Sequence, residues 1–211
     1  YIPPELRENI GELEAAKNKN IPKLVDVKDI KGLFHFHTNR SDGNMTIEQA
    51  CNELKKMGFE YCGVADHSKT ASYAGGIRDE DIEFYLDEID LLNSKQNDFK
   101  IFKGIESDIL SDGNLDYPDE ILKKFDFVII AIHSNFNMSQ KRMTERIVRA
   151  MSSKHSTILA HPTGRLLLAR DPYNVDIIEI IDAALEYKVD LEINASPFRL
   201  DLDWRACKYA K

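Results

Sequence analysis

The sequence predicts an α/β fold in which parallel strands form a closed or nearly closed barrel. Apolar, β-prone runs alternate with amphipathic, helix-like runs along most of the 211 residues, which is typical of parallel sheets with helical crossovers. Six strand-like runs can be counted, and that number of units favours a barrel over a flat sheet. A seventh strand would be needed to close such a barrel, and we expect it soon after Lys211.

The elements are expected in alternation after an N-terminal linker. Residues 1–30 are assigned to that linker because Pro3, Pro4 and Pro22 flank a Glu/Lys-rich stretch. The barrel domain is expected over 31–211. Its first helix is expected to begin at the N-cap Thr46 and to stop at Gly58. Strands are expected over 33–37, 61–65, 100–105, 125–132, 157–160 and 189–193. Helices are expected over 46–57, 79–96, 139–151 and 175–187.

Composition and charge limit the possible functions. With 43% hydrophobic residues the chain can bury one sizeable core, so one folded domain is expected. A net charge of −8 argues against a free-standing nucleic-acid binder, although bound cations would reverse the local potential at a carboxylate-rich site. No segment is apolar for long enough to span a bilayer and no secretory signal is present, which predicts a cytoplasmic protein. Tyr1 at the start and an uncapped helical pattern at the end indicate a fragment of a longer protein.

The histidines lie where a metal site would be expected. Five of the six come where a β-prone apolar run gives way to a polar loop: His35, His37, His67, His133 and His161. The carboxyl ends of barrel strands meet at one mouth, where active sites of such folds are built, so we expect these imidazoles to converge. His155 lies in the polar stretch 152–156 instead and is expected to be a solvated loop residue.

The His-x-His motif at 35–37 gives the strongest indication of a metal site. His35 and His37 alternate with an apolar residue, which would place both imidazoles on one face of a strand, about 7 Å apart. Asp42 in the following loop is either a ligand or ordinary turn chemistry, and both interpretations stay open. Asp66 stands beside His67, which predicts a ligand next to a carboxylate that orients it.

Three further residues extend the cluster. Glu106 ends the third strand, where a carboxylate could bridge two cations, although a solvated glutamate is the commoner case at such a position. His133 and His161 could each be structural when taken singly, but they end consecutive strand-like runs. A cluster of His with Asp and Glu and without Cys favours Zn²⁺, Mn²⁺ or Fe²⁺, and the number of ligands indicates more than one ion. Paired ions suit phosphoester hydrolysis.

Basic residues near the expected mouth fit a phosphate substrate. Arg165 and Arg199 each follow a polar loop after a strand, and either guanidinium could bind a phosphate through two hydrogen bonds. For Arg142, Arg146 and Arg170 a surface salt bridge is favoured over a functional role.

These motifs resemble those of the PHP (polymerase and histidinol phosphatase) family, which has a strand-borne His-x-His, an Asp-His, a strand-end Glu and two further histidines. Segments 1–8, 161–167 and 194–202 are similar to the C-terminal PHP domain of bacterial family X DNA polymerases, and the similarity covers essentially the whole chain. The resemblance implies a distorted (β/α)7 barrel of the PHP type, lacking its last strand in this chain, and a polymerase domain ahead of it in the natural protein.

The resemblance also implies two or three divalent metal ions, typically Mn²⁺ or Zn²⁺ with Fe²⁺ as a further option. The ligands carried over by matching motif are His35, His37 and Glu106 for the first metal, the bridging Glu106 with His133 and His161 for the second, and Asp42 and His67 for the third. The bridging glutamate and the two histidines of the second metal would be the catalytic residues. The family ends with an Asp-x-His motif that does not occur after Asn194, so the third site would be incomplete in this chain.

The activity implied by the resemblance is the processing of DNA 3′ ends in repair, as a 3′–5′ exonuclease with 3′-phosphatase or abasic-site activity in some members. Two other functions remain open. A phosphomonoesterase of the histidinol-phosphatase kind would use the same site on a small metabolite. A non-catalytic domain would use the metals to stabilise a scaffold for a polymerase.

Overall fold

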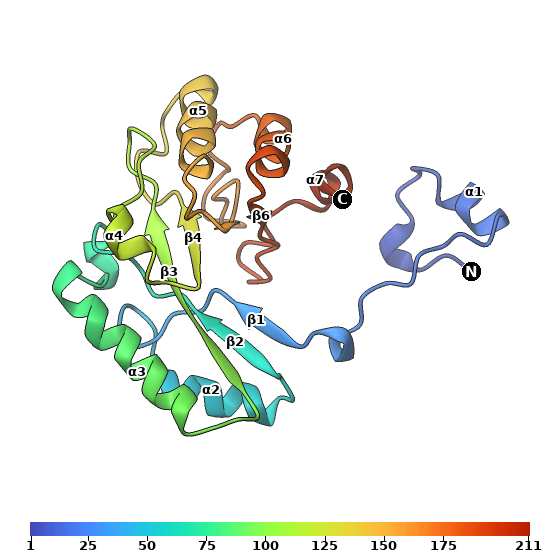
Figure 1. The fold of residues 1–211 in the computed structure, drawn as a ribbon. Coiled ribbons are helices and arrows are strands. Elements are labelled where there is room, and N and C mark those ends of the chain that lie inside the picture. Colours follow the sequence, from blue (N-terminus) through green and yellow to red (C-terminus); the bar gives the residue numbers. More distant parts are fainter. The chain divides into compact units, whose positions relative to one another are not determined.

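Six strands form one sheet whose spatial order repeats their order in the chain, and every neighbouring pair is parallel. The computed structural model describes residues 1–211, which divide into two compact units, Tyr1–Lys31 and Gly32–Lys211. The second unit contains the whole sheet (Figure 1). Its strands are β1 (Gly32–Phe34), β2 (Tyr61–Val64), β3 (Lys100–Asp108), β4 (Phe127–Ala131), β5 (Ile158–Leu159) and β6 (Asp190–Leu191). The predicted α/β class with sequential parallel strands is confirmed.

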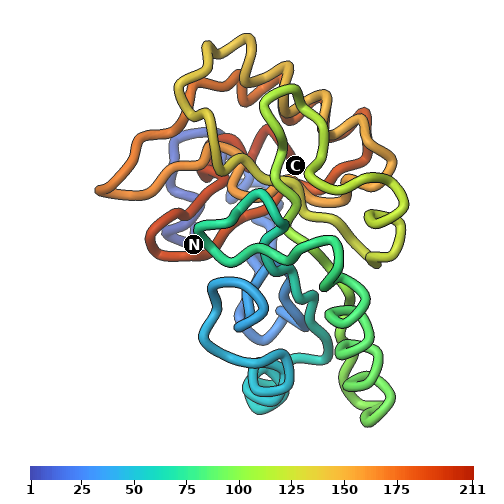
Figure 2. The backbone as a smooth tube through the Cα atoms, turned by 90° about the vertical axis from the view of Figure 1, so that its left-hand side faces the viewer, coloured from blue at the N-terminus to red at the C-terminus, as the bar shows by residue number.

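Helices connect the strands and cover the sheet. They are α2 (Ile47–Lys56), α3 (Ile82–Ser94), α4 (Asp119–Leu122), α5 (Gln140–Met151), α6 (Ile177–Tyr187) and α7 (Trp204–Ala210). The first, α2, begins at a capping box in which the Thr46 hydroxyl accepts from the Gln49 N–H and the Gln49 side chain accepts from the Thr46 N–H. In Figure 2, α2 and α3 lie at one end of the domain and α5 and α6 at the other, so each pair covers a different half of the sheet.

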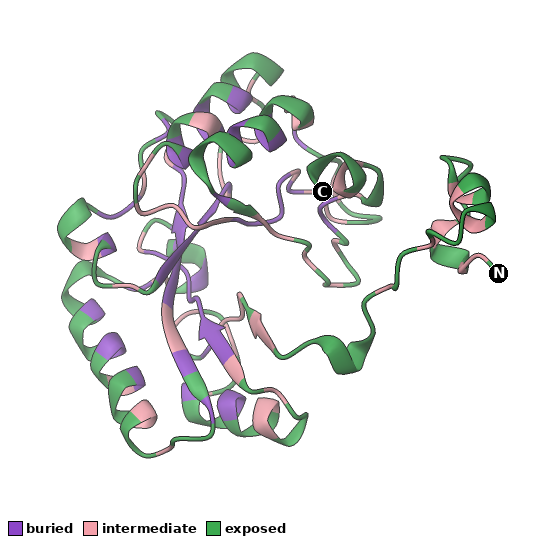
Figure 3. Ribbon diagram, turned by 45° about the vertical axis from the view of Figure 1, so that its right-hand side comes forward, coloured by how far each residue is buried: buried purple, intermediate pink, exposed green.

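The main core lies between the sheet and the helices. Alternate residues of β3, such as Ile101 and Ile105, are fully buried there together with Ile130 of β4 and Ile147 of α5. Figure 3 shows this buried centre in the middle of the sheet and on the inward faces of the helices. Because side chains alternate along a strand, the intervening residues of β3 point to the opposite face, which carries the candidate site.

Aromatic rings fill that opposite face at the amino-terminal end of the sheet. The ring of Phe127 is 5.0 Å from that of Phe34, and the Phe34 ring is 5.7 Å from that of Phe102. Glycine leaves room for them, because a Cβ at Gly104 would come within 2.1 Å of the Phe127 ring. Glu106 follows two residues later on the same face, directly beyond this aromatic layer.

Several expectations about single elements were wrong. The first strand ends at Phe34 rather than at residue 37, because His35 adopts a positive φ of 73° that stops the extended chain. Its two histidines therefore lie on the loop after the strand. The expected helix over 79–96 is a 3-10 turn (Asp79–Asp81) followed by α3. His155 is not solvated, since its side chain is 12% exposed and lies 3.6 Å from an Asp119 carboxylate oxygen.

The first unit contains only short helical segments. These are a 3-10 turn (Pro4–Leu6), α1 (Glu12–Lys17) and a second 3-10 turn (Val27–Asp29), none of which has a buried residue. The assignment of residues 1–30 to a linker and 31–211 to the barrel domain stays a prediction. None of the helices in the structure combines the length and apolar character needed to cross a membrane.

Candidate metal centre

Five imidazoles surround one carboxylate at the carboxyl ends of the strands. Glu106 of β3 lies at the centre and is 1% exposed. Each imidazole ring has two others as neighbours, at centroid distances of 5.3 Å (His35–His37), 4.3 Å (His37–His67), 4.9 Å (His67–His133), 5.3 Å (His133–His161) and 5.9 Å (His161–His35). The structure thus brings together all five histidines that the sequence singled out, and we call this arrangement the histidine ring.

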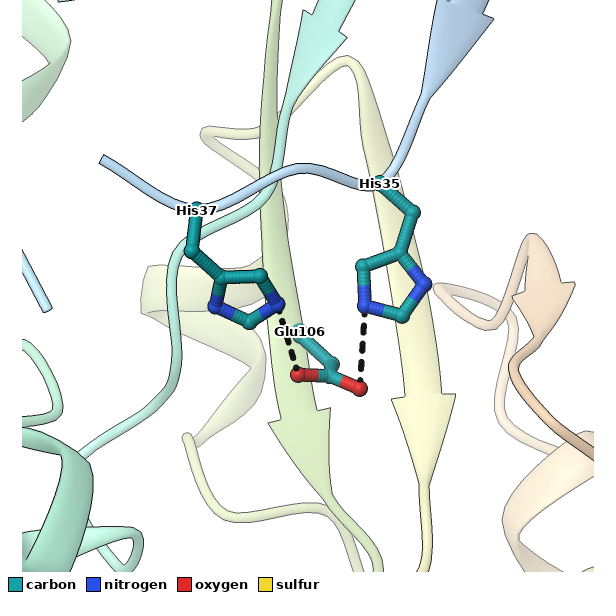
Figure 4. A group of neighbouring side chains, drawn as sticks. All are labelled: His35, His37 and Glu106. Carbon is teal, nitrogen blue, oxygen red and sulfur yellow. Dashed lines mark ion pairs between the residues drawn. The ribbon is translucent and has the colours of Figure 1, made fainter. Parts of the chain in front are cut away.

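Both carboxylate oxygens of Glu106 contact imidazole nitrogens. Oε1 lies 3.1 Å from His35 Nε2, 3.1 Å from His161 Nε2 and 3.3 Å from His133 Nε2. Oε2 lies 2.9 Å from His67 Nδ1 and 3.5 Å from His37 Nε2. Figure 4 shows how the two histidines of the first loop reach the carboxylate from one side. A carboxylate among five imidazole nitrogens is a donor set that suits divalent transition metals.

A second carboxylate connects the two edges of the sheet, near β1 and β6. Glu192, directly after β6, has Oε1 2.5 Å from His35 Nδ1, while its Oε2 accepts the backbone N–H of His161 at 2.7 Å. The contact orients the His35 ring so that Nε2 faces Glu106. It also connects the loop after β1 with β5 and β6 across the mouth of the curled sheet.

Asp108 has the same role for His133. It follows Glu106 on the same face of β3, and its Oδ1 is 2.6 Å from His133 Nδ1. The second nitrogen of that ring, Nε2, is thereby directed at Glu106. Carboxylates that hold the far nitrogen of a histidine in this way are typical of metal centres, where they fix the tautomer and the ring orientation.

In the metal-free protein these carboxylates set the charge of the histidines. Burial lowers the pKa of His35, but Glu106 and a second carboxylate outweigh it and raise that pKa from 6.5 to about 10. The same balance raises the pKa of His133 to about 9. At His37 burial prevails and the pKa falls to about 4. Burial opposes ionisation of Glu106, but His35 and His133 hold its pKa well below the usual range.

The unsatisfied polar atoms of the histidine ring fit bound metal ions. Although some of them lie close to an oppositely charged group, four buried atoms of the histidine ring make no hydrogen bond: His37 Nδ1, His67 Nδ1, His161 Nδ1 and Glu106 Oε2. Buried polar atoms without partners are rare in proteins because each costs free energy. Three sets of side chains have ligand atoms within 4.8 Å of one another: His35, His37 and Glu106; His37, Asp42 and His67; and His67, Glu106 and His133. Imidazoles and carboxylates without thiolates suit Mn²⁺, Fe²⁺ or Zn²⁺.

Asp42 and Asp66 have different roles at this mouth. Asp42 is half exposed, and its carboxylate lies 3.3 Å from His37 Nδ1 and 3.8 Å from His67 Nε2, at the outer side of the ring. Asp66 does not contact the imidazole of His67 in the way the sequence suggested. Its carboxylate instead accepts from the backbone N–H and the hydroxyl of Thr38, both at 2.7 Å, and so holds the loop that carries Asp42.

The two arginines predicted to bind phosphate both donate to backbone carbonyls, but Arg199 makes only one such bond, from Nη1 to the carbonyl of Arg165 at 3.4 Å. The Arg165 guanidinium donates to the carbonyl of Arg199 at 2.9 Å, to the carbonyl of Leu200 and to Asp203 at 3.1 Å. It therefore braces the loop after β6, and its phosphate role stays a prediction. Arg199 lies on that braced loop. Burial lowers the pKa of the His161 imidazole, and the positive charge of Arg199 acts in the same direction.

The sequence interpretation missed both orienting carboxylates. Glu192 follows a predicted strand directly, as Glu106 and the histidines do, so its position at a strand end was an available signal. Asp108 stands two residues after Glu106, and the alternation of a strand would have placed the two on one face. What the sequence could not show is which histidine each carboxylate contacts.

Comparison with known proteins agrees with this geometry. The family model of the PHP domain matches residues 34–196, the part of the chain that contains every member of the histidine ring. The chain belongs to the PHP family. A crystal structure of histidinol phosphate phosphatase from Lactococcus lactis, complexed with zinc, L-histidinol and phosphate, has the same fold, with a TM-score of 0.55 and 18% identity over 78% of this chain and 73% of that one. The predicted PHP-type barrel fold is confirmed.

Two kinds of relative resemble this PHP domain in sequence. A DNA polymerase/3′-5′ exonuclease PolX from Bacillus subtilis is 41% identical over 95% of this chain. A probable phosphatase from Thermoanaerobacter is 32% identical over 78% of this chain. The chain spans 35% of the length of the first relative and 64% of the second.

Proposed function

We propose that this PHP domain is a metal-dependent phosphodiesterase that removes nucleotides from DNA 3′ ends, as a 3′–5′ exonuclease in DNA repair. The observation that carries the proposal is the histidine ring, in which five imidazole nitrogens lie within 3.5 Å of one buried carboxylate. The relative from Bacillus subtilis, named as a polymerase and 3′-5′ exonuclease, supports DNA as the substrate. A family X polymerase domain in the same natural chain, and a cytoplasmic location, belong to this proposal.

The proposed site holds two or three divalent ions, with Mn²⁺ or Zn²⁺ favoured. Glu106 would contribute to two of the positions, the first together with His35 and His37 and the second together with His133 and His161. His67 and Asp42 would hold the third ion. Bound ions would supply the Lewis acidity that activates a water molecule and neutralises charge on the reacting phosphate.

The protein's own groups orient the substrate and the ligands. Glu192 and Asp108 hold His35 and His133 with one nitrogen directed inward, so these rings need no reorganisation during the reaction. Arg199, whose charge acts on His161, would hold a phosphate oxygen of the substrate. Arg165 keeps that loop in position.

A second candidate function has specific support. The Thermoanaerobacter relative is named as a probable phosphatase, and the Lactococcus structure holds histidinol and phosphate. A small phosphomonoester would use the same ligands. The two functions differ in whether the site accepts a polymer end.

The deciding experiment follows a 5′-labelled oligonucleotide with Mn²⁺ present. The expected result is a ladder of products that shorten by single nucleotides, and His133→Ala should reduce the rate at least about 100-fold because it removes a ligand and a contact of Glu106. His155→Ala is the matched control, since this histidine lies outside the ring. Faster hydrolysis of histidinol phosphate than of the oligonucleotide would favour the second function. Metal binding without hydrolysis of either substrate would favour a scaffold domain.

A further inference from the structure

One aromatic side chain stands exposed at the edge of the histidine ring. Tyr73 lies in the 3-10 turn η3 (Ser72–Ala74) and is 71% exposed, whereas its neighbours Ala71 and Ala74 are buried at 0% and 5% exposure. Its ring centroid is 6.1 Å from that of His67. A large apolar ring left in solvent beside a catalytic centre has no role in the core of the protein.

The segment that carries this ring is held to the strand end by hydrogen bonds. The N–H of Ile77 donates to the carbonyl of His67 at 2.8 Å, and that of Gly76 donates to Ala71 at 3.2 Å. The N–H of Thr70 donates to an Asp116 carboxylate at 2.7 Å. Gly76 packs so closely that a Cβ there would lie 1.9 Å from the carbonyl oxygen of Ser68. The loop therefore presents the ring from a fixed base.

The phenol also lies within electrostatic reach of the charged groups of the centre. Burial, followed by the negative charges of Asp108 and Glu106, raises the pKa of Tyr73 to about 12, while the positive charge of Arg199 acts in the opposite direction. The hydroxyl thus stays protonated near neutral pH. The geometry that matters for binding is the exposed ring itself, which lies 6.1 Å from the His67 ring at the edge of the histidine ring.

We propose that Tyr73 is a substrate-binding residue that stacks on the base of the terminal nucleotide, and this inference rests on the proposed function. The substrate class it selects is a phosphate ester whose organic part is a planar heterocycle. Nucleobases of any kind have a π face, so stacking would bind the 3′ end without sequence preference.

The test compares two oligonucleotides that differ only at the 3′ end, one with an ordinary terminal nucleotide and one with an abasic tetrahydrofuran residue. Tyr73→Ala should raise KM about tenfold on the ordinary end, with little change in kcat, and should leave KM on the abasic end unchanged. Tyr73→Phe should behave as the wild type, because the ring and not the hydroxyl makes the contact. Tyr209→Ala, an exposed tyrosine of α7, is the matched control. An equal loss on both substrates would overturn the inference.

A binding measurement separates this inference from the proposed function. By calorimetry on the Mn²⁺-loaded protein, deoxyadenosine 5′-monophosphate should bind more tightly than deoxyribose 5-phosphate, and Tyr73→Ala should remove the difference. If the wild type cleaves no oligonucleotide, the exonuclease proposal fails, and the calorimetry still decides the role of Tyr73. If both ligands bind equally to the wild type, the stacking role is wrong even when cleavage is observed.

Discussion

At the scale of single residues, carboxylates that lie behind the histidines orient the candidate metal centre. Glu106 is surrounded by histidines, and two of these are held from behind by Glu192 and Asp108 at 2.5 and 2.6 Å. The contact of Glu192 joins residues 157 positions apart in the chain. This residue therefore both orients the His35 imidazole and joins the loop after β1 to β5 and β6.

Replacement of Glu192 by Gln should weaken metal binding about tenfold to a hundredfold, because a neutral amide orients the His35 ring less firmly and lowers its basicity. The measurement is competition for Mn²⁺ or Zn²⁺ between the protein and a chelator of known affinity. Glu186→Gln on the exposed side of α6 is the matched control and should leave the affinity unchanged. Equal affinity of the Glu192 variant and the wild type would show that this contact has no part in the centre.

At the scale of elements, a buried arginine connects α5 to the loops after β3 and β4. Arg146 is 3% exposed and donates to the carbonyls of Ile109, Leu110 and Ser134. The expected surface salt bridge was wrong here, because the residue faces the interior and binds backbone groups instead. Arg170 departs from the same expectation, since it donates to the carbonyl of Gly164. These arginines stabilise the loops around the site.

Arg146→Met should lower the free energy of unfolding by at least about 2 kcal/mol, because it leaves buried carbonyl groups without donors. Urea titration followed by circular dichroism measures the change. The exposed neighbour Arg142 provides the control, and Arg142→Met should stay within about 0.5 kcal/mol of the wild type. A similar small effect of both variants would mean that water replaces the guanidinium at no cost.

At the scale of the whole molecule, the mouth of the barrel makes stability depend on pH and on metal. The chelated protein has histidines shifted in both directions from 6.5: His35 to about 10 and His133 to about 9, but His37 to about 4. His35 and His133, whose pKa values are raised, stabilise the fold below pH 6.5 and lose this contribution as the pH rises through 9 to 10. His37, whose pKa is lowered, is buried in its neutral form and destabilises the fold as the pH falls from 6.5 towards 4.

The melting temperature of the chelated protein should therefore be highest near pH 6.5 and fall on both sides. With saturating Mn²⁺ the trend above pH 6.5 should reverse, since ions bind only deprotonated imidazoles and stabilise the state that binds them. Thermal melting from pH 5 to 9, with chelator and with metal, measures both profiles. A chelated protein that is more stable at pH 9 than at pH 7 would contradict the assignment of the protonated histidines.

The sequence by itself determined the α/β class, the order of the six parallel strands and the set of residues that meet at their carboxyl ends. Such predictions succeed because strand and helix patterns are local, and because parallel strands place all their carboxyl ends at one edge of the sheet. Glu106 and the five histidines could be named for that reason. Each was recognisable from its place after an apolar run.

Only the tertiary structure decided how those residues contact one another. The pairing of Glu192 with His35, the use of Asp66 to hold Thr38 and the burial of Arg146 join segments far apart in the chain. No local pattern encodes such pairs, because the direction of each side chain depends on loop conformations such as the positive φ of His35. The sequence thus identified the members of the histidine ring, while the packing of the barrel determined which of their atoms face inward.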